Sequence, residues 1–125
     1  MGIDIGLRGE SRLKVTEADT AVALGTGSLP LLATSRLITL CEQAAACAVE
    51  RVLDAPKTTV AMRVQIDHLQ PVAVDHVIIA EAVLEKVEGR RLTFVVSASD
   101  ERGLVAAGKL VRVLVDADHF MDRTR

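Results

Sequence analysis

One apolar segment, residues 34–53, constrains the fold of this 125-residue chain more than any other part of it. A loop with two glycines and a proline, residues 25–30, precedes the segment, and Pro56 follows its end. Thr34 and Ser35 carry hydroxyls that suit the start of a helix, and the alanine-rich middle has a strong helix propensity. Since apolar side chains fall on nearly every side of such a helix, we expect other structure to wrap around it.

Glu42 interrupts this apolar pattern. It falls on one stripe of the expected helix with Ile38, Ala45 and Val49, which lie one or two turns away. A carboxylate on a buried stripe is costly unless it is paired, and buried carboxylates are common in active sites. Glu42 is therefore a candidate functional residue, although a core carboxylate satisfied by the backbone or by a partner chain remains the alternative.

From about residue 58 the pattern changes to alternating apolar and polar residues, which is typical of strands. We expect strands at residues 7–15, 58–68, 75–87, 91–99 and 104–115. Because tight turns join most of them, the strands should be antiparallel, and the fold class should be α+β with a curved sheet around the helix. Residues 1–118 should form one domain, and residues 119–125 a frayed polar tail. Strands that are apolar on both faces predict a dimer.

His68 ends the expected strand in phase with Val60, Met62, Val64 and Ile66, so its imidazole should point toward the helix. An acid and an imidazole that converge in an apolar cleft would meet the geometric requirement of acid–base catalysis. Taken alone, a histidine before a proline-containing loop can also simply end a strand. The Thr34 hydroxyl can likewise be only a helix cap.

Composition excludes several other classes of function. A net charge of −2 and 2% aromatic residues argue against nucleic-acid binding. No apolar stretch reaches the roughly 20 residues of a membrane span, and residues 1–5 do not resemble a signal peptide. Cys41 and Cys47 fall on different faces of the expected helix, which is typical of small buried hydrophobes in a reducing compartment, so we expect a cytoplasmic protein. No side chains have the spacing of metal ligands, and no metal is expected.

The motifs resemble those of the hotdog-fold acyl-CoA thioesterases, in the branch that includes fluoroacetyl-CoA thioesterase. The resemblance rests on the run Gly-Thr-Gly-Ser-Leu-Pro-Leu-Leu-Ala-Thr at residues 25–34, on Glu-Gln-Ala-Ala from Glu42, on His68, and on Val-Glu-Gly-Arg-Arg-Leu at residues 87–92. It implies a hotdog fold and a catalytic set of Thr34, Glu42 and His68.

The resemblance also implies a substrate site. The implied binding residues are Gly27, Ser28, Ala61, Arg63 and Arg91. Ala61 takes the position of a glycine that contacts the ligand in the related enzymes. Arg63 and Arg91, with Arg90 and Arg112, are candidates for the phosphates of coenzyme A.

The implied reaction is hydrolysis of an acyl-CoA thioester to free acid and CoA, with Glu42 as general base or nucleophile and His68 as its acid–base partner. The implied assembly is a homodimer or a tetramer, and no cofactor is needed beyond the CoA of the substrate. The last strand lacks the histidine and glutamate of the related run, a departure that bears on turnover. The aromatic lid residues tied to fluoroacetyl selectivity also have no counterpart, since no aromatic residue occurs before Phe94, so fluoroacetyl-CoA is a poor substrate candidate. A hotdog enoyl-thioester hydratase and a non-catalytic acyl-CoA-binding dimer are the alternatives.

Overall fold

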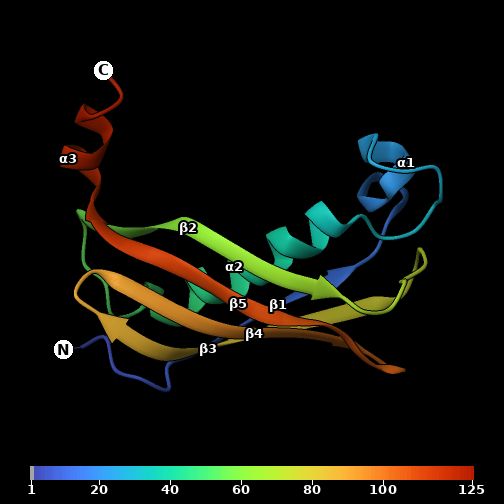
Figure 1. Cartoon of the computed structure of the whole chain (residues 1–125), viewed down its shortest axis with the longest axis horizontal. Coiled ribbons are helices and arrows are strands. Elements are labelled where there is room, and N and C mark those ends of the chain that lie inside the picture. Colours follow the sequence, from blue (N-terminus) through green and yellow to red (C-terminus); the bar gives the residue numbers. More distant parts are fainter. Residues whose placement is uncertain (1) are drawn as a thin grey trace.

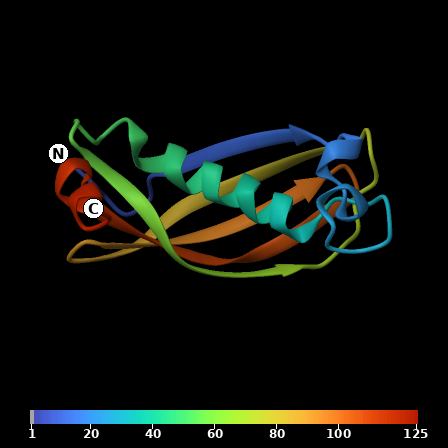
Figure 2. The same cartoon turned by 90° about the horizontal axis from the view of Figure 1, so that it is seen from above.

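Five antiparallel strands form one sheet that curls around a central helix. The computed structural model describes residues 2–125. The elements are β1 (Arg8–Lys14), η1 (Glu17–Asp19), α1 (Ala21–Leu24), α2 (Thr34–Glu50), β2 (Lys57–His68), β3 (Val77–Glu88), β4 (Arg91–Asp100), β5 (Gly103–Asp116) and α3 (Ala117–Asp122). The strand order is β1-β3-β4-β5-β2, and α2 crosses the concave face between the edge strands β1 and β2 (Figure 1, Figure 2). The predicted α+β class and the curved sheet around the helix are confirmed.

Helix α2 packs most closely on β1, at Gly9. A side chain at this glycine would place its Cβ 2.0 Å from the Ala44 carbonyl oxygen and 2.5 Å from the Ala48 nitrogen. Glycine on the strand and alanine on the helix thus let the two backbones approach closely. The predicted alternation of β1 is confirmed, since Gly9 and Val15 are buried whereas Arg8 and Lys14 are exposed.

The expectation that α2 is enclosed on nearly all sides is only partly met in the single chain. Seven of its residues are buried, and they include Leu37, Leu40 and Ala44. A polar stripe along the opposite side is exposed: Ser35, Thr39, Gln43, Cys47 and Glu50. Cys47 is exposed, so the expectation of two buried cysteines is wrong for this residue, and both cysteines are free thiols. The apolar surface of the helix is thus less continuous than the sequence predicts, because one side of α2 faces away from the sheet.

The predicted inward phase of β2 is correct only for its second half. Val64, Ile66 and His68 are half-buried, whereas Met62 is 47% exposed. The pairing with β5 shifts between Ala61 and Arg63, so that Met62 is the extra residue of a β-bulge. A bulge inserts one residue and changes which residues face the core. The alternation could not show this bulge, because Met62 fits either face.

The end of the chain is helical where a frayed tail was expected. Asp116 accepts hydrogen bonds from the backbone nitrogens of Asp118 and His119, at 3.1 and 3.3 Å, and so caps α3. A carboxylate at this position satisfies amides that the helix itself leaves free.

As for membranes, none of the helices among residues 2–125 combines the length and the apolar character needed to span one.

Candidate functional site

The hydroxyl of Thr34 and the imidazole of His68 form a hydrogen-bonded pair where α2 begins and β2 ends. The distance from Thr34 Oγ1 to His68 Nδ1 is 2.8 Å. Ala33, not Thr34, occupies the N-cap position of α2, and no side chain caps the helix there. The Thr34 hydroxyl is therefore not a cap, as the simpler interpretation held, but a partner of the histidine.

The second ring nitrogen of His68, Nε2, is buried and has no hydrogen-bond partner within the described part of the chain. A shallow cavity of about 270 Å³ adjoins the pair and is lined by Thr34, His68, Leu69, Gln70 and Pro71. A buried polar atom without a partner is costly, so its presence at a cavity is typical of a group that meets a ligand or another chain.

The loop after His68 is held by the neighbouring hairpin. The backbone nitrogens of Leu69 and Gln70 both donate to the Val105 carbonyl, at 2.7 and 3.2 Å. Arg102 donates to the Pro71 carbonyl and to the Asp100 carboxylate, which it meets at 2.7 Å. The hydrogen bond from the Arg102 side chain lowers the pKa of Asp100, and burial of the carboxylate opposes this effect. The wall of the cavity is thus fixed by residues from β4 and β5.

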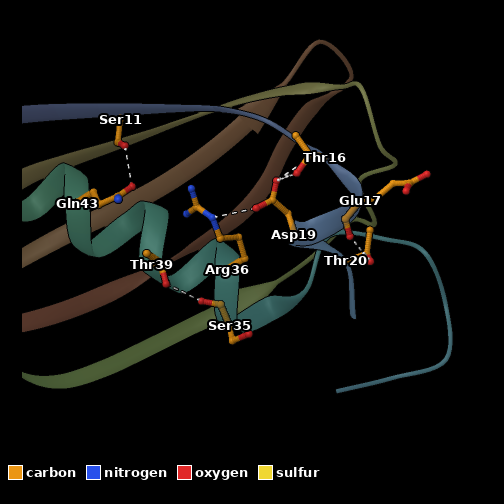
Figure 3. A network of polar contacts seen from close by, with 9 residues as sticks. All are labelled: Ser11, Thr16, Glu17, Asp19, Thr20, Ser35, Arg36, Thr39 and Gln43. Carbon is orange, nitrogen blue, oxygen red and sulfur yellow. Dashed lines mark hydrogen bonds and ion pairs between the residues drawn. The ribbon is translucent and has the colours of Figure 1, made fainter. Parts of the chain in front are cut away.

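A second polar network anchors the start of α2 (Figure 3). Asp19 accepts from the Arg36 Nε at 3.2 Å and from the Thr16 nitrogen and hydroxyl at 2.8 and 2.9 Å. Burial raises the pKa of Asp19, but the Thr16 hydrogen bonds and the Arg36 charge outweigh it, and the net pKa is lowered. The network ties η1 to the first turn of α2, where Thr34 lies.

Glu42 lies two turns further along α2 and faces Arg112 of β5. The Arg112 Nη1 is 3.9 Å from the Glu42 Oε1. Thr59 holds the same guanidinium, since Arg112 Nε donates to its hydroxyl at 2.8 Å and Nη2 to its carbonyl at 2.9 Å. The Arg112 side chain is only 12% exposed, and this burial lowers the pKa of the guanidinium while the Glu42 charge opposes the shift. Glu42 therefore has a fixed positive partner on the sheet.

Glu42 and His68 have different partners within one chain. Thr34 and Glu42 are eight residues apart, which places their Cα atoms about 12 Å apart along the helix axis. Glu42 does not line the cavity beside His68. The expectation that the carboxylate and the imidazole converge therefore stays a prediction, which a second chain would have to fulfil.

The expected substrate-binding residues do not gather at one place in the single chain. Gly27 and Ser28 are exposed in the loop before α2, and Ala61 is exposed on β2 opposite Arg112. Arg63 is exposed on β2, whereas Arg91 begins β4 at the hairpin with Glu88. None of them lines the cavity beside the Thr34–His68 pair, and their role in binding stays a prediction.

Two features of the site were missed by the sequence analysis. Arg112 was considered only for coenzyme A phosphates, but it lies inward between Glu42 and Thr59. The role of Arg102 in holding Pro71 was also missed. Neither has a local signal, because each joins segments that are far apart in the sequence. As for metals, no group of three or more ligating side chains gathers within residues 2–125.

The sheet, the central helix and the site define a class of protein, the hotdog fold. The whole chain superposes on the fluoroacetyl-CoA thioesterase FlK with a TM-score of 0.93 at 23% identity, over 100% of this chain and 97% of that one. A hot-dog-like protein from Thermanaerovibrio acidaminovorans gives a TM-score of 0.89 at 24% identity, with 98% and 90% of the two chains covered. A thioesterase superfamily member from Thermus thermophilus gives 0.90 at 22% identity, with 99% and 92% covered.

Sequence comparison gives the family within this class. The family described as fluoroacetyl-CoA-specific thioesterase matches residues 15–118, which is most of the chain. A comparison with curated proteins finds no match. The chain therefore belongs to the fluoroacetyl-CoA-specific thioesterase family, and the predicted resemblance is confirmed.

Proposed function

We propose that this protein hydrolyses an acyl-CoA thioester with Thr34, Glu42 and His68 as its catalytic residues. The observation that carries the proposal is the Thr34–His68 hydrogen bond of 2.8 Å, which leaves the buried Nε2 of the imidazole without a partner beside a cavity. Membership of a thioesterase family supports the reaction class. The lack of aromatic residues before Phe94 favours an acyl group other than fluoroacetyl.

The proposed chemistry divides the proton transfers between the two groups. When His68 is an imidazolium, Nδ1 donates its proton to the hydrogen bond with the Thr34 oxygen, and Nε2 can give its proton to the departing thiolate, which leaves a neutral ring. Glu42 takes a proton from the attacking water or attacks the carbonyl carbon itself. In the first route the water oxygen bonds to the carbonyl carbon and the carbon–sulfur bond breaks. In the second route the carbon–sulfur bond breaks to leave an acyl–Glu42 anhydride, which a water molecule then hydrolyses, restoring the carboxylate. Both routes give the free acid and CoA. The proposed reaction needs no cofactor besides the CoA of the substrate.

We further propose that the site is completed in a homodimer formed through β2. This strand has one edge paired with β5 and its other edge free among the described residues. A free edge strand is a ready site for pairing with a second chain. Pairing of two copies would also give Glu42 and His68, which have separate partners in one chain, a common site. Two free thiols in the chain support a reducing cytoplasmic setting.

The test is thiol release from a panel of acyl-CoAs, followed with DTNB. Glu42→Ala and His68→Ala should each lower kcat/KM about 100-fold or more, because each removes a proton-transfer group. Glu50→Ala and His76→Ala are matched controls, since both residues are of the same type but contact neither Thr34 nor His68. They should stay near the wild-type rate.

Two results would count against the proposal. Absence of thiol release from every acyl-CoA tested would remove the hydrolase. Full activity of Glu42→Ala or His68→Ala, in protein with an unchanged circular dichroism spectrum, would remove that residue from the mechanism.

A further inference from the structure

A second cavity lies far from the Thr34–His68 pair, between α3 and the end of the sheet. Its volume is about 410 Å³. Its charged and aromatic lining consists of Lys57, Arg90, Asp116, His119, Phe120 and Arg123. Three permanent cations thus face one cavity in a chain whose net charge is −2. Such a concentration of positive charge indicates an anionic ligand.

The cations of this basic cavity are not neutralised by the protein. Within residues 2–125, Lys57, Arg90 and Arg123 form no ion pair. Asp116 is the one acidic residue of the lining, and its carboxylate already accepts the backbone amides at the start of α3. The Arg123 guanidinium lies 5.2 Å from the centre of the Phe120 ring, which holds it over an apolar wall. Guanidinium groups suit phosphate because they can donate two parallel hydrogen bonds.

The basic cavity lies at the start of the edge strand β2. Lys57 begins β2, and His68 ends it, so the cavity and the Thr34–His68 pair lie at opposite ends of one strand. Figure 1 shows α3 beyond the β2 edge of the sheet. In the proposed dimer, a second copy paired through β2 would lie on this same side. When two β2 edges pair antiparallel, the start of one strand lies beside the end of the other. The basic cavity of one copy would then adjoin the Thr34–His68 pair of its partner.

We propose that the basic cavity binds the phosphate-bearing nucleotide end of the acyl-CoA whose thioester is cleaved at the Thr34–His68 pair of the other copy. This inference rests on the proposed function and on the dimer through β2. Coenzyme A carries its phosphates on the nucleotide and its thiol at the end of a long pantetheine arm, so one substrate can span both places. The cavity contributes binding through charge and takes no part in the chemistry.

The test compares acyl-CoA with the matching acyl-pantetheine, which has the same thioester but no phosphates. In Arg90→Ala/Arg123→Ala, the ratio of kcat/KM for acyl-CoA to kcat/KM for acyl-pantetheine should fall roughly tenfold, mainly through KM for acyl-CoA. Arg90→Lys/Arg123→Lys should recover much of the ratio, since it keeps both charges. Arg125→Ala is the matched control, because Arg125 lies next to the same helix but pairs with Asp122 outside the cavity, and it should keep the wild-type ratio.

Calorimetric binding of 3′,5′-ADP to the full chain tests the cavity independently of turnover. The wild type and Arg125→Ala should bind this nucleotide, whereas the double alanine variant should bind it roughly tenfold more weakly or not at all. An unchanged activity ratio together with unchanged nucleotide binding would overturn the inference. An equal loss on both thioesters would also overturn it, because that result indicates structural damage. If the wild type binds 3′,5′-ADP but releases no thiol from any acyl-CoA, the proposed hydrolysis is wrong, whereas nucleotide binding in the basic cavity is supported.

Discussion

Thr34 and Glu42, both with a proposed catalytic role, lie on α2. A different neighbour accommodates each of the two side chains. Thr34 lies in the first turn of α2, where its hydroxyl bonds to His68 and does not cap the helix, because Ala33 holds the N-cap position. Glu42 stands in the middle of α2 and faces a buried guanidinium, which offsets the cost of placing a carboxylate there. Each functional group is thus accommodated by one neighbour that the sequence places far away.

At the residue scale, Asp100 gives a prediction for the pH dependence of stability. Its pKa is lowered chiefly by the Arg102 hydrogen bond, so the folded protein holds this proton more weakly than the unfolded chain. The unfolded state binds more protons, and the contribution of Asp100 is present above its unfolded pKa of about 3.9 and lost as the pH falls through the lower native pKa. Asp100→Asn should therefore lower the urea midpoint at pH 7, and the difference from wild type should shrink at pH 3.

Asp54→Asn provides the control for this measurement. Asp54 is exposed and belongs to no ion pair among the described residues, so its variant should follow the wild-type curve. A destabilisation by Asp100→Asn that is the same at both pH values would contradict the linkage and would indicate lost hydrogen bonds or packing instead.

At the scale of the elements, the contact between β1 and α2 predicts the effect of a single methyl group. Gly9→Ala would place a Cβ against the backbone of α2 at Ala44 and Ala48. Because these are backbone atoms, either β1 or α2 would have to shift to relieve the clash. The free energy of unfolding should fall by about 3 kcal/mol, as for an overpacked core. Chemical denaturation measures this change.

Ser11→Ala is the matched variant on the same face of β1. Its side chain makes one 3.3 Å hydrogen bond, to Gln43 at the exposed side of α2, so the loss should stay below about 1 kcal/mol. A Gly9→Ala protein as stable as Ser11→Ala would show that α2 can move away from the sheet at little cost.

At the scale of the whole molecule, the separation of Glu42 and His68 predicts that two chains share each site. Glu42→Ala and His68→Ala should each be inactive, but a mixture that has been unfolded and refolded together should regain about a quarter of the wild-type activity. Half of the dimers would then be mixed, and each would contain one intact site. Thiol release after refolding measures this recovery.

The two parent variants refolded separately and then combined without denaturant are the control, and they should stay inactive while their subunits do not exchange. No recovery in the co-refolded mixture, although size-exclusion chromatography shows dimers, would mean that both residues act from the same chain.

The sequence by itself determined the parts of this protein that follow from local periodicity. The long helix from Thr34, the alternation of β1 and the antiparallel hairpins can be predicted because each depends on residues within one or two turns of a helix or one strand. The candidate residues Thr34, Glu42 and His68 could be named because they break or continue such patterns, and because their motifs resemble a known family.

Only the tertiary structure decided which of these groups meet. The bulge at Met62 depends on pairing with β5, the Thr34–His68 bond joins residues 34 positions apart, and Arg112 reaches Glu42 across the curved sheet. Helix α3 and its basic cavity depend on Asp116 and on strands that end together. Such contacts are set by how the sheet curls around α2, and no short stretch of sequence contains that curvature.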